Sequence, residues 1–137
     1  MSPPQQIIAT WQHRGMVFSG EKPGKPPVTI DGKATEGPSP MDALLIAVAG
    51  CTGADVVLVL EKKRIDLREL RIAVTGKRRE ELPQRYTAIG IVYTVTAPGA
   101  TEQAVRQAID LSLATYCSVT HSLNPDIPIT YELVLQA

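Results

Sequence analysis

The residues in this sequence best suited to chemistry are its two cysteines. Cys51 stands between two glycines in the apolar stretch "LLIAVAGCTGADVVLVLEKK", and Cys117 stands in "TYCSVTHSL". In a reducing compartment, two such thiols are more typical of a transient catalytic or redox-sensing disulfide than of a structural one. The alternative is that Cys51 is a small buried hydrophobe with no chemistry, because free cysteine is among the most buried residue types.

The surroundings of Cys51 work against its reactive form, the thiolate. The sequence predicts a helix that begins at Pro40, and Cys51 lies about three turns into it, beyond the reach of the N-terminal dipole. Its helical neighbours are one carboxylate, Asp55, and the apolar Ala47, Val48 and Ala54. An apolar setting and a nearby negative charge both disfavour a thiolate. A reactive Cys51 therefore needs a cation from another part of the structure.

Small residues flank Cys51 on its helix. Gly50 and Gly53 each weaken a helix by about 1 kcal/mol relative to alanine, which indicates a packing reason for them. With the nearby alanines they predict a flat strip that would let another helix, or a ligand, approach the sulfur. Cys117 differs, since it falls at the junction of two helical pieces, where unpaired backbone N–H groups would favour its thiolate.

Other chemistries fit the sequence less well. His13 and His121 would complete a zinc site with Cys51 and Cys117, but no paired spacing such as C-x-x-C occurs. A hydrolase built on Cys117 and His121 lacks an evident orienting Asn or Asp, and both residues share one short helix. No glycine-rich phosphate loop is present. We therefore expect neither a metal nor a cofactor.

The elements that must position these residues alternate between strands and helices, which predicts the α+β class. Ser39 as N-cap, Pro40 at the first helical position and Asp42 in the first turn predict the start of the long helix, which runs to Lys63. The charged run "KRREE" is interpreted as a solvated edge of a hairpin. In chain order we expect strands at 5–12, 16–18 and 28–32, the helix 40–63, a hairpin of strands around 70–74 and 88–95, a helix with Thr101 as N-cap, a helical piece at 117–124 and a strand at 127–135.

Length and charge narrow the function classes. At 137 residues the chain fits one domain. Lys plus Arg and Asp plus Glu number 14 each, so charge gives no reason to expect nucleic acid or an anionic membrane as partner. The apolar stretch 43–60 approaches a membrane span in length, but Asp55 near its centre favours a helix buried in protein. The start "MSPPQQIIATWQHR" lacks the features of a secretory signal, which favours a cytoplasmic protein.

The segment "GPSPMDALLIAVAGCTGADV", followed later by "TYCSVTHSL", resembles the OsmC/Ohr family of cysteine peroxidases. The likeness runs from about Thr10 to Leu135, so a single OsmC-like domain is expected over residues 1–137. It implies an OsmC-like fold in which antiparallel sheets wrap central cysteine-bearing helices. It also implies an intertwined homodimer with active sites at the dimer interface.

The resemblance implies roles for three residues in oxidative stress defence. Cys51 would attack a hydroperoxide and become a sulfenic acid, and Cys117 would condense with it to a disulfide. A dithiol reductant, a lipoylated protein in parts of the family, would restore both thiols. Arg14, in "WQHRGMVF", would supply the cation that stabilises the Cys51 thiolate.

The sequence also departs from the peroxidase pattern. The position of the family's glutamate, directly after the proline, is Met41 here, with Asp42 next to it and Glu36 more distant. Cys117 is followed by Ser118 where the peroxidases have proline. "SPM" and "YCSV" resemble a less characterised branch of OsmC-like proteins. The alternative function is therefore a non-peroxidase member that binds a small apolar or electrophilic ligand, or senses redox state, at the dimer interface.

Overall fold

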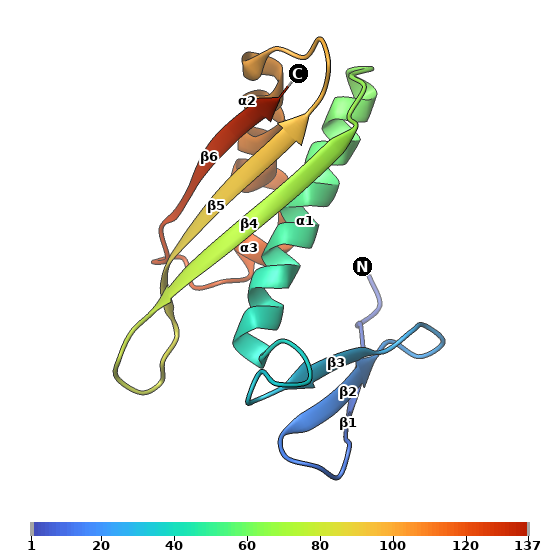
Figure 1. Cartoon of the computed structure of the whole chain (residues 1–137), viewed down its shortest axis with the longest axis vertical. Helices are drawn as coiled ribbons and strands as arrows, with labels where there is room; N and C mark the ends of the chain where they lie inside the picture. The colour runs from blue at the N-terminus through green and yellow to red at the C-terminus, as the bar shows by residue number, and fades with distance from the viewer. Residues whose placement is uncertain (1, 137) are drawn as a thin grey trace. The chain divides into compact units, whose positions relative to one another are not determined.

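The computed structural model describes residues 2–136, and its elements confirm the α+β class (Figure 1). The strands are β1 (Ile8–Trp11), β2 (Val17–Glu21), β3 (Val28–Asp31), β4 (Glu69–Arg78), β5 (Tyr86–Thr96) and β6 (Ile129–Gln136). The helices are α1 (Pro40–Lys62), α2 (Glu102–Leu111), the π-helix η1 (Ser112–Tyr116) and α3 (Ser118–His121). The chain forms an N-terminal unit that ends at Leu44 and a C-terminal unit that begins at Leu45.

The N-terminal unit holds a three-stranded antiparallel sheet in the order β1-β2-β3. The turn between β1 and β2 uses the left-handed backbone region at His13 (φ 60°) and Gly15 (φ 47°). β1 is shorter than expected and β2 longer, because their pairing runs only from Ile8 opposite Glu21 to Trp11 opposite Phe18.

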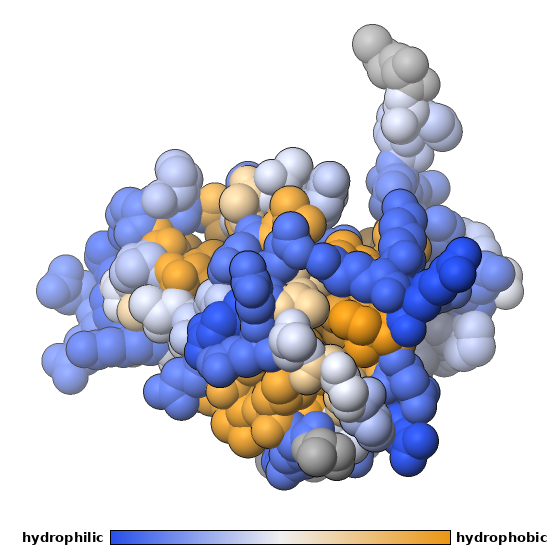
Figure 2. Space-filling model, turned by 90° about the horizontal axis from the view of Figure 1, so that it is seen from above, coloured by the Kyte–Doolittle hydropathy of each residue, from blue (hydrophilic) through white to orange (hydrophobic). Residues whose placement is uncertain are grey.

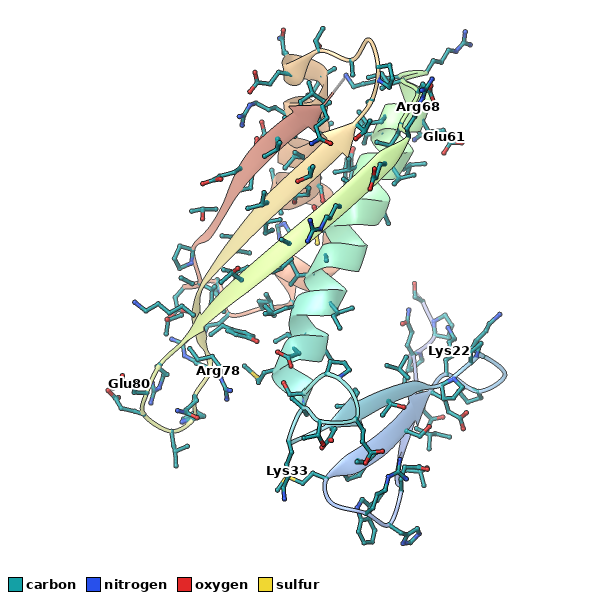
Figure 3. All side chains as sticks on the ribbon, in the orientation of Figure 1. Lys22, Lys33, Glu61, Arg68, Arg78 and Glu80 are labelled. Atoms are coloured by element: carbon teal, nitrogen blue, oxygen red, sulfur yellow. The ribbon has the colours of Figure 1, made fainter. Side chains whose placement is uncertain are left out.

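The C-terminal unit holds a second three-stranded sheet in the order β4-β5-β6. β4 and β5 form the predicted antiparallel hairpin, and its charged turn lies at the end where Figure 3 labels Arg78 and Glu80. β6 runs parallel to β5, so the chain must cross over between them, and α2, η1 and α3 form that crossover. The central strand β5 buries alternate side chains in the core: Ile89, Ile91, Tyr93 and Val95.

Helix α1 begins where the sequence predicted. The Ser39 hydroxyl accepts a hydrogen bond from the Asp42 backbone N–H at 3.0 Å, and the Asp42 carboxylate accepts one from the Ser39 N–H at 3.0 Å. This reciprocal pair satisfies two backbone donors at the helix start. The buried residues of α1 recur at helical spacing and form one face: Val48, Thr52, Gly53, Val56 and Leu60.

The two glycines of α1 differ in the space around them. A Cβ atom at Gly53 would lie 2.8 Å from the Ile72 Cδ1 atom of β4, so Gly53 lets the helix approach the sheet closely. A Cβ atom at Gly50 would meet nothing within 4 Å. Of the expected flat strip, Gly53 is therefore used by the sheet and only the Gly50 side is open.

Much of α1 is exposed in the single chain. Its large apolar residues Ile46, Val57 and Leu58 are 59%, 43% and 51% exposed, and Figure 2 shows hydrophobic surface left uncovered among polar side chains. By length and composition this helix could also cross a membrane, and 28% of its most apolar window is buried within the chain.

Candidate thiol site

The two cysteines lie together in the C-terminal unit. Cys51, on α1, is half-buried, and Cys117, between η1 and α3, is fully buried. The Cys51 side chain lies close enough to the Cys117 thiol to influence its pKa, although the two residues are far apart in the sequence. The predicted pair of thiols therefore has the proximity that disulfide chemistry needs.

Cys117 is held as a neutral thiol. Burial raises its pKa above the ordinary value and the neighbouring Cys51 side chain raises it further, while the Thr120 hydroxyl and then the Thr120 backbone N–H oppose this shift. The prediction that the helix junction would favour the Cys117 thiolate is therefore wrong. The junction does supply a backbone donor, but the loss of water around a fully buried sulfur outweighs it.

Cys51 stands at the border between the buried and the exposed faces of α1. Its neighbour Thr52 is buried, whereas Gly50 and Ala54 are exposed. Cys51 thus has Cys117 as a neighbour on one side. On its own helix it lies between small, exposed residues.

A chain of buried hydroxyl groups lies next to the thiols, and sequence reasoning missed it. The Tyr93 hydroxyl contacts the Thr52 Oγ1 atom at 2.8 Å, and the Ser112 hydroxyl lies 2.8 Å from both Thr52 Oγ1 and Asp55 Oδ2. Burial is the main cause that raises the Tyr93 pKa to about 12. The available signal was Thr52 and Asp55, which interrupt an apolar helix at positions that share a face with its buried residues.

Arg14 belongs to the N-terminal unit and is paired with Glu36. The Arg14 Nε atom lies 3.0 Å from each Glu36 carboxylate oxygen, and Nη2 lies 2.7 Å from Oε1. This hydrogen-bonded ion pair lowers the Glu36 pKa and raises the Arg14 pKa. Both side chains are about half exposed, at 56% and 44%. Glu36, named from the sequence only as a distant substitute, is thus the acid that holds this arginine.

Asp31 fixes the loop that carries Glu36. Its buried carboxylate accepts hydrogen bonds from the Lys33 N–H at 2.9 Å, the Thr35 hydroxyl at 2.7 Å and the Glu36 N–H at 3.1 Å. These donors, first the Lys33 N–H, hold the pKa of Asp31 well below its usual range. The backbone from which Glu36 reaches Arg14 is therefore fixed by a charged anchor.

The two histidines, which were the remaining candidates for chemistry, each contact a residue nearby in the sequence. The His121 Nε2 atom contacts the Leu113 carbonyl oxygen at 3.1 Å, and the His13 ring packs 4.7 Å from the Trp11 ring. Over residues 2–136, no group of three or more His, Cys, Asp or Glu side chains is arranged to hold a metal ion.

Comparisons with known proteins agree with one another. The family described as OsmC-like protein matches residues 31–132. Protein YhfA of Escherichia coli (strain K12) is 38% identical over 123 residues, which cover 88% of this chain and 92% of that protein. A solved structure of an OsmC-like protein from Mycoplasma pneumoniae gives a TM-score of 0.85 at 21% identity and covers 100% of both chains.

A more distant solved structure is the organic hydroperoxide resistance protein OhrB of Bacillus subtilis. It gives a TM-score of 0.62 at 16% identity and covers 95% of this chain and 97% of that chain. At these identities the two structures demonstrate a shared fold.

Proposed function

Because this chain belongs to the OsmC-like protein family, on its OsmC-like branch, we propose that it is a thiol-dependent peroxidase acting in oxidative stress defence. Its substrates would be organic hydroperoxides and also hydrogen peroxide. The observation that carries the proposal is the contact between the half-buried Cys51 and the buried Cys117. Cys51 is the more exposed of the two residues, so a small oxidant would reach it before it reached Cys117.

The proposed cycle has three steps. The Cys51 thiolate attacks the distal oxygen of the hydroperoxide, the O–O bond breaks, and the alkoxide takes a proton and leaves as an alcohol. The resulting sulfenic acid is attacked by the Cys117 sulfur, so an S–S bond forms and the hydroxyl group leaves with the Cys117 proton as water. A dithiol reductant, such as a lipoylated protein, then exchanges with the disulfide, restores both thiols and is itself oxidised to a disulfide.

Arg14 is proposed as the cation that stabilises the Cys51 thiolate, and Glu36 as the residue that positions it. This role comes from the family resemblance. It is supported by the bidentate geometry of the Arg14–Glu36 pair, since an arginine held by a carboxylate presents its charge in a fixed direction. In this chain Glu36 would replace the acid that the position of Met41 lacks.

The active form is proposed to be a cytoplasmic homodimer of a single OsmC-like domain. The family match runs from the N-terminal unit into the C-terminal unit, which favours one functional domain. The exposed apolar residues of α1 leave a face that a second copy would cover, as the family resemblance implies.

Redox sensing is a second candidate, and one observation favours it. The raised pKa of Cys117 keeps the second thiol neutral, so its attack on an oxidised Cys51 is slow near neutral pH. A slow dithiol suits a sensor whose disulfide persists better than it suits a peroxidase with rapid turnover.

Stopped-flow oxidation of the reduced protein separates these functions. We expect cumene hydroperoxide to oxidise wild type far faster than a free thiol, Cys51→Ser to abolish the reaction, and Cys117→Ser to stop it at a sulfenic acid. Arg14→Ala should slow the first step. Oxidation of wild type at the rate of a free thiol would contradict the peroxidase, and a disulfide that still formed with a chemical oxidant would favour the sensor.

A further inference from the structure

The hydroxyl chain beside the thiols joins three elements of the C-terminal unit. It runs from Tyr93 on β5 through Thr52 on α1 to Ser112 on η1, and returns to α1 at Asp55. The carboxylate only accepts and Ser112 has a single proton, so Ser112 donates to Asp55 and accepts from Thr52. The Thr52 proton is then used, so Tyr93 donates to Thr52. One assignment of donors therefore satisfies the whole chain.

Ser112 is also the residue that holds the backbone of Cys117. The Cys117 N–H donates to the Ser112 carbonyl oxygen at 2.8 Å, which closes the π-turn of η1. The hydroxyl of Ser112 is at the same time bonded to Thr52, the residue directly after Cys51. One residue thus connects the segments that carry the two thiols, through its side chain on one side and its main chain on the other.

We propose that Ser112, through its hydrogen bonds to Thr52 and Asp55, is a positioning residue that keeps the Cys117 thiol against the Cys51 thiol. By doing so it sets how readily the two sulfurs form a disulfide. The importance of this role for a peroxidase cycle rests on the proposed function. The role itself concerns only how the two thiols are held next to each other.

Two features make Ser112 suited to this role. Its side chain is fully buried, so water cannot replace the hydrogen bonds it makes, and the bond to Asp55 is assisted by charge. The π-turn inserts one extra residue into the helical path, and such turns are frequent at functional sites. Without an anchor to α1, this turn can relax and carry Cys117 away from Cys51.

The test is a thiol–disulfide equilibrium, which needs no peroxidase activity. One glutathione disulfide takes two electrons from the Cys51 and Cys117 thiols, giving one protein disulfide and two glutathione thiols. The equilibrium constant is the effective concentration of one protein thiol at the other. As long as both redox forms stay folded, it reports the native geometry and not the free energy of unfolding.

For Ser112→Ala we expect the effective concentration to fall about tenfold, as the loss of a buried, charge-assisted hydrogen bond implies. Ser112→Thr, which keeps the hydroxyl, should retain most of it. Ser122→Ala is the matched control, because this exposed hydroxyl donates to the Ser118 carbonyl and does not contact α1. Val105→Ala is the stability control, since it opens a cavity at a buried position of α2 without removing any bond of Ser112.

An unchanged effective concentration in folded Ser112→Ala, or an equal fall in Val105→Ala, would overturn the proposal. If Ser112→Ala does not fold, Asp55→Asn takes its place, with an expected fall of about threefold because an amide accepts more weakly than a carboxylate. No fall in Asp55→Asn would equally contradict the role. Failure of the peroxidase proposal would show separately, as slow oxidation of wild type by hydroperoxide with a normal glutathione equilibrium.

Discussion

Two polar assemblies of this chain differ in their access to water. In the N-terminal unit the Arg14–Glu36 ion pair is about half exposed. In the C-terminal unit the hydroxyls of Thr52, Ser112 and Tyr93 are fully buried and bonded in sequence. The first carries full charges and the second is mostly neutral.

The difference shows which polar group stabilises the fold and which is free to serve function. An exposed ion pair contributes little to stability, because water and salt replace each partner at little cost. A buried hydroxyl that loses its partner cannot turn to water and costs its full desolvation penalty. The neutral chain should therefore matter more for stability, and the charged pair more for chemistry.

The largest expected effect is on Thr52. Thr52→Val keeps the shape of the side chain but leaves the Tyr93 hydroxyl and Ser112 without their shared partner, so we expect the free energy of unfolding to fall by about 2 kcal/mol. Urea unfolding followed by circular dichroism measures this change. Thr10→Val on exposed β1 is the matched control and should lie within about 0.5 kcal/mol of wild type. Equal values for the two variants would contradict the distinction between the assemblies.

The second prediction concerns the pH dependence of disulfide formation. Because the Cys117 pKa is raised above its ordinary 9.0, its reactive thiolate is scarce at neutral pH and increases about tenfold per pH unit. After oxidation of Cys51, the rate of disulfide formation should therefore keep rising through pH 9. Stopped-flow mixing of the sulfenic acid form into buffers from pH 6 to pH 10 tests this. A plateau reached below pH 8 would show that the buried thiol is more acidic than its surroundings indicate.

The two glycines of α1 give a smaller effect of opposite sign. In the single chain Gly50→Ala meets open space and gains helix propensity, so we expect it to raise the free energy of unfolding by about 0.5–1 kcal/mol. Gly53→Ala gains the same propensity, but its Cβ atom would press on Ile72, so the gain should vanish. Urea unfolding of both variants is the measurement. A Gly50→Ala protein that loses stability and dissociates on gel filtration would instead place that residue in the proposed dimer contact.

Local signals in the sequence were enough to predict much of the fold. The Ser39 cap, the proline after it and the acid in the first turn define the start of α1, and alternation along 70–95 predicts the hairpin, because both depend on neighbouring residues. The pairing of Cys51 with Cys117 came from a family resemblance and not from spacing, since contacts between residues distant in sequence leave no local pattern.

The parts that sequence reasoning missed depend on tertiary contacts. The π-turn at 112–116 replaces a continuous helix. Nothing in the segment "DLSLATYC" predicts this turn, because it accompanies a hydrogen bond between the Ser112 hydroxyl and Thr52 of α1. Likewise, the sequence names Glu36 only as a more distant substitute than Asp42, because the link of Glu36 to Arg14 requires the loop that Asp31 closes.

The smallest expected effect on stability, yet a measurable one on chemistry, is at Glu36. Glu36→Gln keeps a hydrogen-bond acceptor for Arg14 but removes the charge, and because the pair is exposed, the urea midpoint should not change. If Arg14 stabilises the Cys51 thiolate, a less firmly held arginine should slow oxidation by cumene hydroperoxide about threefold to tenfold.

Glu81→Gln is the control, since this exposed acid also pairs with an arginine, Arg79, in the hairpin turn. A rate that falls in Arg14→Ala but not in Glu36→Gln would mean that the arginine acts without its partner. Equal rates in all variants would remove Arg14 from the site and leave the two thiols as the whole of its chemistry.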